Sequence, residues 1–539
     1  MMRTAISLAL AAAALAAAGG CSHDEVATSA EHPPDAKGRP PVIVVIFDEF
    51  PTDDLLRPDG KIDANRFPNF ARLAEISTWF PNAYTVYDST FKAVPGILDA
   101  KLPERGTAPD VRDHQPSVYH LMDRLGYEVH KVESGSAVCP PRICPGTRTR
   151  RPGVLDRLKG GGRPARFHKW IGSIRRRERP AFYVHHTLLP HEPWLYLPSG
   201  RPNRPYGEDP IEGINTAVGF DDAQLSQHNH ARHLLQVGYT DRELGRLLAR
   251  LRRTGLLRRA FLAVVADHGY SFDIGAESRR LVTESNVEEV ATVPLFIKAP
   301  GQMEGHVDES LVRNIDIVPT IADLLGTRIW WEHDGHSVYS ATSRERSELV
   351  VETRNLRRQI RIGRQELAER REANRRRWGR LFGTGAQSEL LFGDPWAGVY
   401  RVGPNPELID KRVGLLDLGR PVGRAVTVAR HSKPGPPAAV RAEIANAALL
   451  QDVRPGSPIK PTRVTGRLAG AAALGVRELA LAVNGRIRAV GRSFRLGRRP
   501  DEFFSFVVPE RALREGRNEV RVFEVVDRGR TLVPLGGAG

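Results

Sequence analysis

The stretch Pro41–Phe50, PVIVVIFDEF, decides the fold of this chain. It is an apolar, β-branched run that starts at proline and ends in two acids, a pattern typical of a strand buried in a parallel sheet. In open α/β sheets the site lies at the carboxyl ends of such strands. We therefore interpret Asp48 and Glu49 as candidate metal ligands, with solvated loop acids as the alternative reading.

Strand patterns and helical patterns alternate after this stretch. The alternation predicts an α/β fold with a mostly parallel central sheet sandwiched by helices. The expected strands are Thr78–Phe80, Tyr127–Val132, Ala181–Trp194 and Ala260–Phe272, and the expected helices include Ser117–Gly126 and His228–Leu251.

A hydroxyl pair, Ser89 and Thr90, precedes an apolar, helix-compatible run in Tyr87–Leu98, YDSTFKAVPGIL. Backbone N–H groups at the start of a helix are unpaired and form an anion site. Ser and Thr in front of a helix are also common N-caps without any chemistry. The stretch therefore predicts the start of a helix. It indicates a nucleophile only when other residues of the chain are considered with it.

Polar residues gather at the ends of two further strands. His185, His186 and His191 fall within seven positions, and Asp267 and His268 stand at the end of another apolar run. Carboxylates and imidazoles at neighbouring strand ends suit a divalent cation. These residues predict a site at one edge of the sheet.

Length and net charge limit the number of domains and the kinds of partner that this chain can have. The 539 residues allow two or three domains, and 79 Lys and Arg against 63 Asp and Glu give a net charge of +16. The excess is either solvated surface or a surface for an anionic partner, and the basic region between Arg142 and Arg179 has the same two readings. Zinc-finger and RNA-binding signatures are missing from the sequence, so no nucleic acid partner is expected.

The N-terminus has the pattern of a secretory signal over residues 1–20, with Arg3 ahead of a short Ala/Leu run. Ala18–Cys21 resembles a bacterial lipoprotein cleavage box, which implies a lipid on Cys21 and attachment to the membrane outside the cytoplasm; plain secretion is the alternative. Residues 22–40 would serve as a flexible tether. In an oxidising compartment, Cys139 and Cys144 predict a local disulfide.

Seven motifs occur in the order known from the sulfatase-like branch of the alkaline phosphatase superfamily, which the chain resembles between residues 46 and 326. They are IFDEF, FPNFARLA, TFKAVPGIL, LPHEPW, ADHGYSF, VPLFIKAPG and IDIVPTIADLLG. The resemblance implies that fold, one divalent metal ion (manganese, zinc, calcium or magnesium) and a catalytic domain over residues 41–345.

The same resemblance implies roles for individual residues. Metal ligands would be Asp48, Thr90, Asp267 and His268, with Thr90 also the nucleophile. His191 would be catalytic and contact the substrate's charged group or leaving oxygen. Further substrate-binding candidates are His186, Lys92, Arg279 and Arg280.

One departure from the family pattern shapes the expected function. A sulfatase carries C/S-x-P-S-R at the nucleophile, whereas this chain reads TFKAV from Thr90. The sequence therefore predicts a hydrolase or transferase of phosphate-type esters in the cell envelope, acting through a covalent Thr intermediate. Its anionic substrate would be a phospholipid, a glycan or a wall polymer. The alternatives are a sulfuric ester hydrolase and an inactive protein that binds anionic polymers.

The region after residue 345 carries no site signal. Residues 346–450 are interpreted as a small subdomain and connector, with two short strands and a charged surface helix at Leu367–Trp378. Residues 455–539 show alternating patterns around Asn484-Gly485, a strong hairpin signal. They predict a β-sandwich that binds a polymer or packs against the catalytic domain.

Overall fold

The computed structural model describes residues 38–145, 162–204, 222–275, 278–419, 440–470, 476–496 and 501–536. The secretory signal, Cys21 and nearly all of the expected tether lie outside the described residues. So does the part of the basic region between residues 146 and 161.

A seven-stranded sheet forms the centre of the N-terminal domain, with strand order β3-β4-β1-β5-β6-β2-β7. The first four strands in this order are parallel, and β6 runs antiparallel to β5. The predicted mostly parallel sheet is therefore confirmed. The strands are β1 Val42–Asp48, β2 Thr78–Trp79, β3 Glu128–Val132, β4 Ala181–Pro190, β5 Phe261–Ala266, β6 Leu295–Lys298 and β7 His306–Val307.

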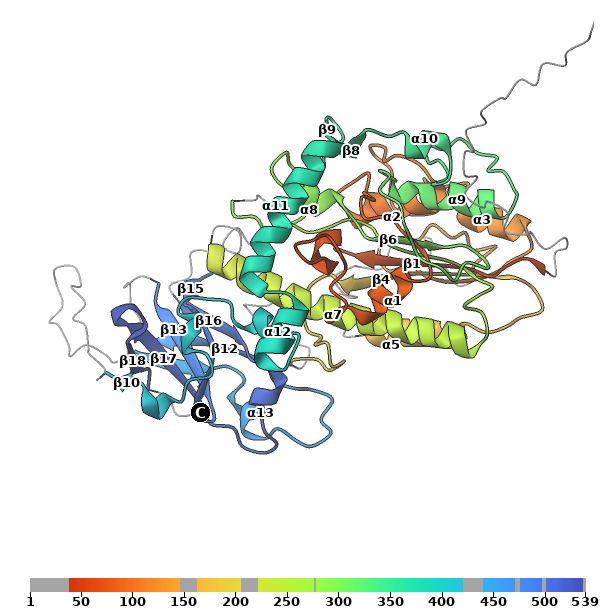
Figure 1. Ribbon diagram of the computed structural model, residues 1–539. Helices are drawn as coiled ribbons and strands as arrows, with labels where there is room; N and C mark the ends of the chain where they lie inside the picture. The colour runs from red at the N-terminus through yellow and green to blue at the C-terminus, as the bar shows by residue number, and fades with distance from the viewer. Residues whose placement is uncertain are drawn as a thin grey trace, which may run out of the picture.

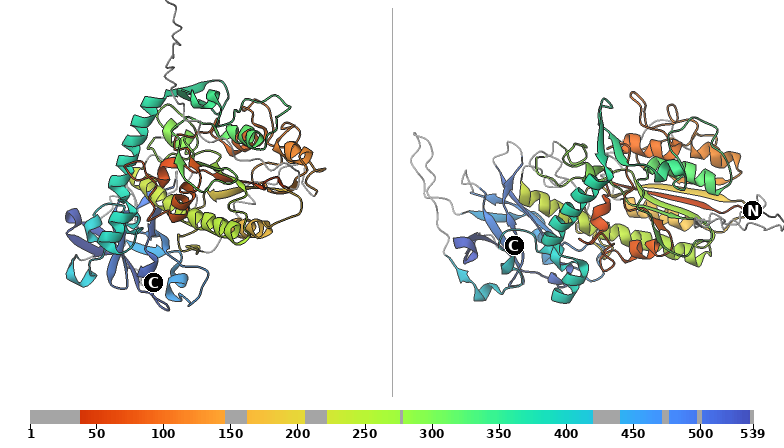
Figure 2. Two further views of the ribbon diagram at one scale, coloured as in Figure 1. Left: turned by 45° about the vertical axis from the view of Figure 1, so that its right-hand side comes forward. Right: turned by 45° about the horizontal axis from the view of Figure 1, so that its top comes forward.

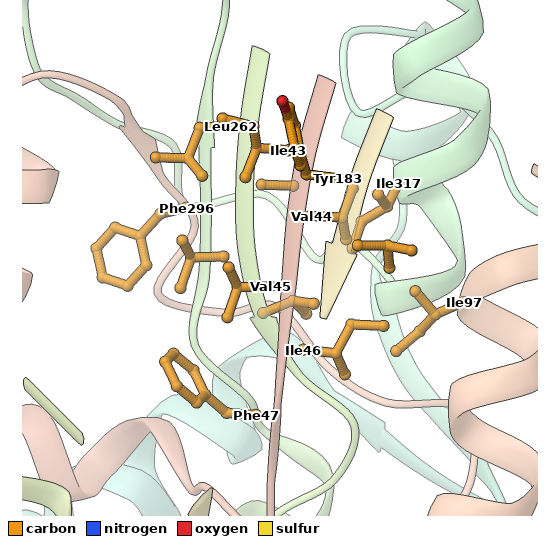
Figure 3. Packing of buried hydrophobic residues seen from close by; sticks show 14 of the residues in the cluster. Ile43, Val44, Val45, Ile46, Phe47, Ile97, Tyr183, Leu262, Phe296 and Ile317 are labelled. Carbon is orange, nitrogen blue, oxygen red and sulfur yellow. The ribbon is translucent and has the colours of Figure 1, made fainter. Parts of the chain in front are cut away.

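Strand β1 lies in the middle of this sheet, and all seven of its residues are buried. Its side chains alternate between the two faces, as a strand's geometry requires. Figure 3 shows Val44 and Ile46 on the side of Ile97 and Ile317, with Val45 and Phe47 on the opposite side. An apolar run without polar interruptions is therefore what this position demands.

Helices cover both faces of the sheet (Figure 1). One face carries α2 Thr90–Asp99, α3 Val118–Arg124 and α9 Ile317–Leu324, and the other carries α1 Pro68–Ala74, α5 Arg163–Ser173 and α7 Ala223–Arg253. Helix α7 begins earlier than expected, because the Asp222 side chain accepts a hydrogen bond from Leu225 N and caps it. Strand β5 ends at Ala266, earlier than expected, which leaves Asp267 and His268 in the following turn.

Helix α11, Arg364–Phe382, is the charged surface helix that the sequence predicts: most of its residues are exposed or half-buried, and four of them are buried. Its Arg371 is buried and donates to Asp53 Oδ1 at 2.7 Å and to Pro81 O at 2.9 Å. Figure 1 shows α11 running from the N-terminal domain to the C-terminal domain. A buried Arg can be satisfied in this way by a carboxylate and a carbonyl. The neighbouring elements are α8 Val287–Ala291, α10 Ala341–Arg344, β8 Glu348–Glu352, β9 Gln359–Gly363 and α12 Gly385–Phe392.

The C-terminal domain consists of two mainly antiparallel sheets, as the hairpin patterns predict. Asn484 and Gly485 have φ values of 51° and 76°, the conformation that a two-residue hairpin turn of the I′ type needs. One sheet has the order β10-β18-β17-β13-β14 and the other β11-β12-β16-β15. The strands are β10 Asp417–Leu418, β11 Arg441–Ile444, β12 Arg463–Ala469, β13 Glu478–Val483, β14 Arg486–Arg492, β15 Phe494–Arg495, β16 Glu502–Val507, β17 Val520–Val526 and β18 Thr531–Pro534.

Strands β10 and β11 precede residue 455, so the expected start of this domain is too late. Both strands are very short, and the four residues of β11, RAEI, offer too few positions for an alternating pattern to stand out. Within the described part of the chain, no helix is both long and apolar enough to cross a bilayer.

Candidate metal and nucleophile site

The site is built around the turn that follows β5. Asp267 accepts hydrogen bonds at Oδ1 from His268 N at 2.7 Å and from Glu49 N at 3.3 Å. Glu49 adopts a positive φ of 58°, which bends the chain sharply after Asp48. A Cβ on Gly269 would lie 2.1 Å from Glu289 O, so only glycine fits there. These constraints bring the ends of β1 and β5 together.

Thr90 is the first residue of α2, and Ser89 is its N-cap. The Thr90 hydroxyl lies 3.4 Å from Asp48 Oδ1, to which it donates, and 3.3 Å from His268 Nε2. All three side chains are buried. The structure thus brings together the four residues proposed as metal ligands, Asp48, Thr90, Asp267 and His268, and gives Ser89 the cap position.

His186 joins this group from β4, where it pairs in register with Ile46 of β1. Its Nε2 lies 3.7 Å from Asp48 Oδ2 and 4.0 Å from Asp267 Oδ2. The sequence predicted a substrate-contacting role for His186, whereas its imidazole faces the two carboxylates. His185 points to the other face of the strand and packs on Phe167 and Trp170.

The residues present fit the divalent cation that the resemblance implies. Asp48, His186 and Asp267 offer ligand atoms that all lie within 4.8 Å of one another. Asp267 Oδ2 and both ring nitrogens of His186 are buried and have no hydrogen-bond partner among the described residues. Buried polar atoms without partners are costly, and a cation of this class would satisfy them.

Electrostatics favour the same reading. Burial raises the pKa of both Asp48 and Asp267. For Asp48 the nearby imidazoles of His191, His186 and His268 outweigh burial, so its pKa falls well below the usual range. Burial and the neighbouring Asp48 charge keep the pKa of Asp267 well above its usual range. Two buried carboxylates that repel each other favour the binding of a cation.

A contact with the backbone determines which ring nitrogen of His268 is free to bind a metal. Burial lowers its pKa to about 4, so the ring is neutral at physiological pH. Its Nδ1 lies 2.9 Å from Gly269 O. A carbonyl only accepts, so Nδ1 carries the hydrogen and the Nε2 lone pair faces Thr90 and Asp267.

A second cluster adjoins the first and contains Glu49, His191 and Arg279. His191 Nε2 lies 3.2 Å from Glu49 Oε1, and Arg279 Nε donates to the same oxygen at 3.0 Å. Arg279 also pairs with Glu192 at 3.2 Å. Burial raises the pKa of Glu49, but Arg279 and His191 outweigh it and lower that pKa to about 2. Arg279 therefore positions a carboxylate, while Arg280, half-buried, lies 3.5 Å from Glu49.

Lys92 lies outside both clusters, contrary to its predicted place in the site. Its Nζ donates to Glu104 O and to Thr107 O, each at 2.6 Å. Two residues along a helix turn a side chain by about 200°, so Lys92 cannot share the face of Thr90.

Gly135 is a site residue that the sequence analysis missed. A Cβ there would lie 2.7 Å from Thr90 Cγ2 and 3.3 Å from His186 Cε1. The adjacent Ser134 hydroxyl donates to His186 O at 2.7 Å. Gly135 has no side chain to indicate a role, and its one usable signal was its position shortly after strand β3.

The loop that holds Gly135 is closed off by Cys139 and Cys144, which form a disulfide with an S–S length of 2.08 Å. The Glu133 carboxylate accepts hydrogen bonds from Val138 N at 3.0 Å and Cys139 N at 3.2 Å. The segment that covers Thr90 is therefore fixed at both ends.

Comparison with known proteins finds a similarity in part of this domain. The family model described as Sulfatase matches residues 165–327. This segment contains His186, His191, Asp267 and His268, whereas Asp48 and Thr90 precede it.

Curated relatives are sulfatases. Arylsulfatase K of Danio rerio is 36% identical over 105 residues, which is 20% of this chain and 20% of that protein. Endo-4-O-sulfatase of Bacteroides thetaiotaomicron is 24% identical over 36% of this chain and 38% of its own length. Choline-sulfatase of Rhizobium meliloti is 23% identical over 54% and 68%. The chain thus spans only about a fifth to two fifths of the length of the first two.

Among solved structures, the chain is similar to a phosphonate monoester hydrolase from Silicibacter pomeroyi, with a TM-score of 0.42 and 19% identity over 58% of this chain and 80% of that one. A second, from Agrobacterium radiobacter, has a TM-score of 0.41 and 15% identity over 62% and 83%.

Proposed function

We propose that this chain, which carries a sulfatase-family segment across its central sheet, is a metal-dependent ester hydrolase or group transferase whose nucleophile is Thr90. The observation that carries the proposal is the position of the Thr90 hydroxyl, buried at the start of α2 and within 3.4 Å of Asp48 and His268. Asp48, His186, Asp267 and His268 would hold the cation. When bound, a divalent cation lowers the pKa of a hydroxyl and neutralises charge on an anionic ester.

The chain's own groups supply the remaining chemistry. The start of α2 presents backbone dipoles to an anionic group held in front of Thr90. The Thr90 hydroxyl passes its proton to Asp48 Oδ1, to which it donates, and its oxygen attacks phosphorus in line. The bond to the leaving oxygen breaks, and His191 Nε2 gives that oxygen a proton. Glu49 Oε1 lies 3.2 Å from His191 Nε2 and helps to orient the ring. Water or an alcohol then attacks phosphorus and gives its proton to His191. The bond from phosphorus to the Thr90 oxygen breaks, and that oxygen takes its proton back from Asp48.

A phosphate-type ester is the preferred substrate class because of the nucleophile itself. Thr90 is followed by Phe-Lys-Ala-Val, and it is neither the Cys nor the Ser that sulfatases convert to formylglycine. The family match favours a sulfuric ester as the second candidate. A third candidate is an inactive protein that binds anionic polymers, and the complete set of buried ligand side chains argues against it.

The proposed place of action is the cell envelope, with a phospholipid, glycan or wall polymer as substrate. The support is the signal-like N-terminus with Cys21, together with a disulfide between Cys139 and Cys144. Disulfides of this kind persist outside the cytoplasm.

The test compares the purified protein with Thr90→Ala and Thr90→Ser on aryl esters of phosphate, phosphodiester, phosphonate and sulfate, each with manganese, zinc, calcium or magnesium. We expect turnover of a phosphate-type ester, its loss in Thr90→Ala, and a phosphoryl group on the Thr90 peptide after rapid quenching. Sulfatase activity that survives in Thr90→Ala would contradict the proposed mechanism. Absence of turnover with polyanion binding in all three proteins would favour the binding protein.

A further inference from the structure

A basic cavity lies at the edge of the central sheet where the strands begin. Its volume is about 100 Å³, and it is formed by the entry to β1 and by the loops that precede β4 and β5. The charged residues that line it are Arg39, Arg175, Arg176, Arg177, Arg179, Arg259 and a single acid, Glu178. We call this surface the basic face.

Most of the charge on the basic face is not neutralised by the protein. Arg177 pairs with Glu128 at 2.8 Å. Arg176 and Arg179 instead donate to backbone oxygens, those of Thr254 and Gly126.

Two other arginines of the basic face, Arg175 and Arg259, are exposed, and neither has a carboxylate within 4.0 Å among the residues that the structure describes. Three further exposed arginines, Arg252, Arg253 and Arg258, stand at the end of α7 and in the loop that leads to β5. A surface with this excess attracts anions.

The basic face lies opposite the candidate site. Pro41 and Ala181 line the cavity at the amino ends of β1 and β4, whereas Asp48 and His186 lie toward the carboxyl ends of the same two strands. Seven residues of extended strand separate the two edges by roughly 20 Å. Figure 2 shows the described chain beginning on the side of the sheet away from the C-terminal domain.

We propose that the basic face docks on a bilayer of anionic phospholipid. Guanidinium groups bind phosphodiester oxygens through paired hydrogen bonds, and clusters of basic residues near a membrane surface are attracted to anionic lipid.

The position of the N-terminus argues for a bilayer rather than a dissolved polyanion. The first described residue, Gly38, adjoins Arg39 of this face, and residues 22–37 separate it from Cys21. Such a segment reaches at most about 60 Å, so a lipid on Cys21 would hold this face close to the membrane.

Docking through the basic face fixes the orientation of the proposed active site relative to the bilayer. The edge with Thr90, Asp48 and His186 then faces away from the bilayer that carries the protein. The accessible esters would be those of a polymer or solute beyond that membrane, and not headgroups of the same leaflet.

The test uses the chain from residue 21 to its end with Cys21→Ser, so that no attached lipid contributes. Sedimentation with vesicles of phosphatidylcholine alone is compared with vesicles that contain about 30% phosphatidylglycerol, at about 50 mM and 300 mM salt. The variant is Arg175→Glu with Arg259→Glu. The matched control is Arg517→Glu with Arg530→Glu, the same charge change on exposed arginines of the C-terminal domain.

We expect salt-sensitive binding to the anionic vesicles only, a loss of at least tenfold in the Arg175/Arg259 variant, and a change within about twofold in the control. Thermal midpoints check that each variant is folded, and Arg175→Gln with Arg259→Gln replaces the reversal if it is not. Equal binding of variant and parent, an equal loss in the control, binding to neutral vesicles, or retention by dextran sulfate without vesicle binding would each overturn the proposal. Because the readout is binding, its failure is distinct from failure of the proposed catalysis.

Discussion

The hydroxyl of Thr90 lies 3.3 Å from Nε2 of His268, a residue 178 positions further along the chain. The contact joins the start of a helix on one face of the sheet to the turn after a central strand. Because Nδ1 of His268 donates its hydrogen to Gly269 O, Nε2 presents a lone pair to the Thr90 hydroxyl. The predictions below test what surrounds that contact.

Gly135→Ala should lower kcat/KM by about a hundredfold while leaving the fold intact. The added methyl group would meet Thr90 Cγ2 at 2.7 Å and displace the hydroxyl, and a shift of about 1 Å at a reacting group has effects of this size. Gly172→Ala is the control, since a Cβ there has no atom within 4 Å. Unchanged turnover in Gly135→Ala would show that Thr90 is not held against this loop.

His186→Gln should release the metal. Its imidazole faces Asp48 and Asp267, so its loss should weaken metal affinity by about ten- to a hundredfold. Metal content after dialysis against graded chelator measures this without any assay of activity. His185→Gln changes the neighbouring residue, which packs on Phe167 and Trp170, and should keep the metal. Equal metal content in both variants would remove His186 from the ligand set.

Arg371→Ala should destabilise the protein by roughly 3–5 kcal/mol, because it leaves Asp53 without its bidentate partner and Pro81 O without a donor. Arg376→Ala, on the exposed side of the same helix, breaks a pair with Glu372 and should cost no more than about 0.5 kcal/mol. Denaturant unfolding measures both. Similar costs for the two changes would contradict the structural role given to α11.

Lys298 should make stability depend on pH above neutrality. Burial, with a smaller effect from Arg258, lowers its pKa from 10.5 to about 8. Between pH 8 and 10.5 the unfolded chain therefore binds more protons at this residue, and the folded state gains stability as pH rises, by roughly 3 kcal/mol in total. The free energy of unfolding of the parent minus that of Lys298→Met should rise over this window. A flat difference would show that Lys298 is not buried as an ammonium at pH 7.

The sequence predicted the parts of the fold whose residues carry a strong pattern. Strand β1 is an uninterrupted apolar run rich in β-branched residues, and a run of that kind is typical of a strand buried on both faces of a sheet. Asp48 ends one such strand, and Asp267 and His268 directly follow another, so their convergence at one edge follows from parallel topology. Thr90 needed the family resemblance, since a hydroxyl before a helix is also an ordinary cap.

What the sequence could not predict depends on contacts between distant segments. His186 and His185 are adjacent and chemically alike, and only the register of β4 against β1 decides which of them faces the carboxylates. Gly135 acts through the side chain that it lacks, which leaves no chemical signature. Arg279 and Lys92 were assigned by distance along the chain, yet Arg279 is held by Glu49 and Glu192 while Lys92 turns to Thr107.

Helix α11 has a practical consequence for anyone who wishes to shorten this chain. A fragment ending at residue 345 would lose Arg371, the partner of Asp53. It would also lose Trp378, whose ring packs edge-on against the His230 ring at a centroid distance of 4.4 Å. Phe382 and Val399 also belong to an apolar cluster with Leu235 of α7. A minimal expression fragment must therefore extend at least through residue 400, and limited proteolysis within α11 should inactivate the protein while every ligand of the site is still covalently present.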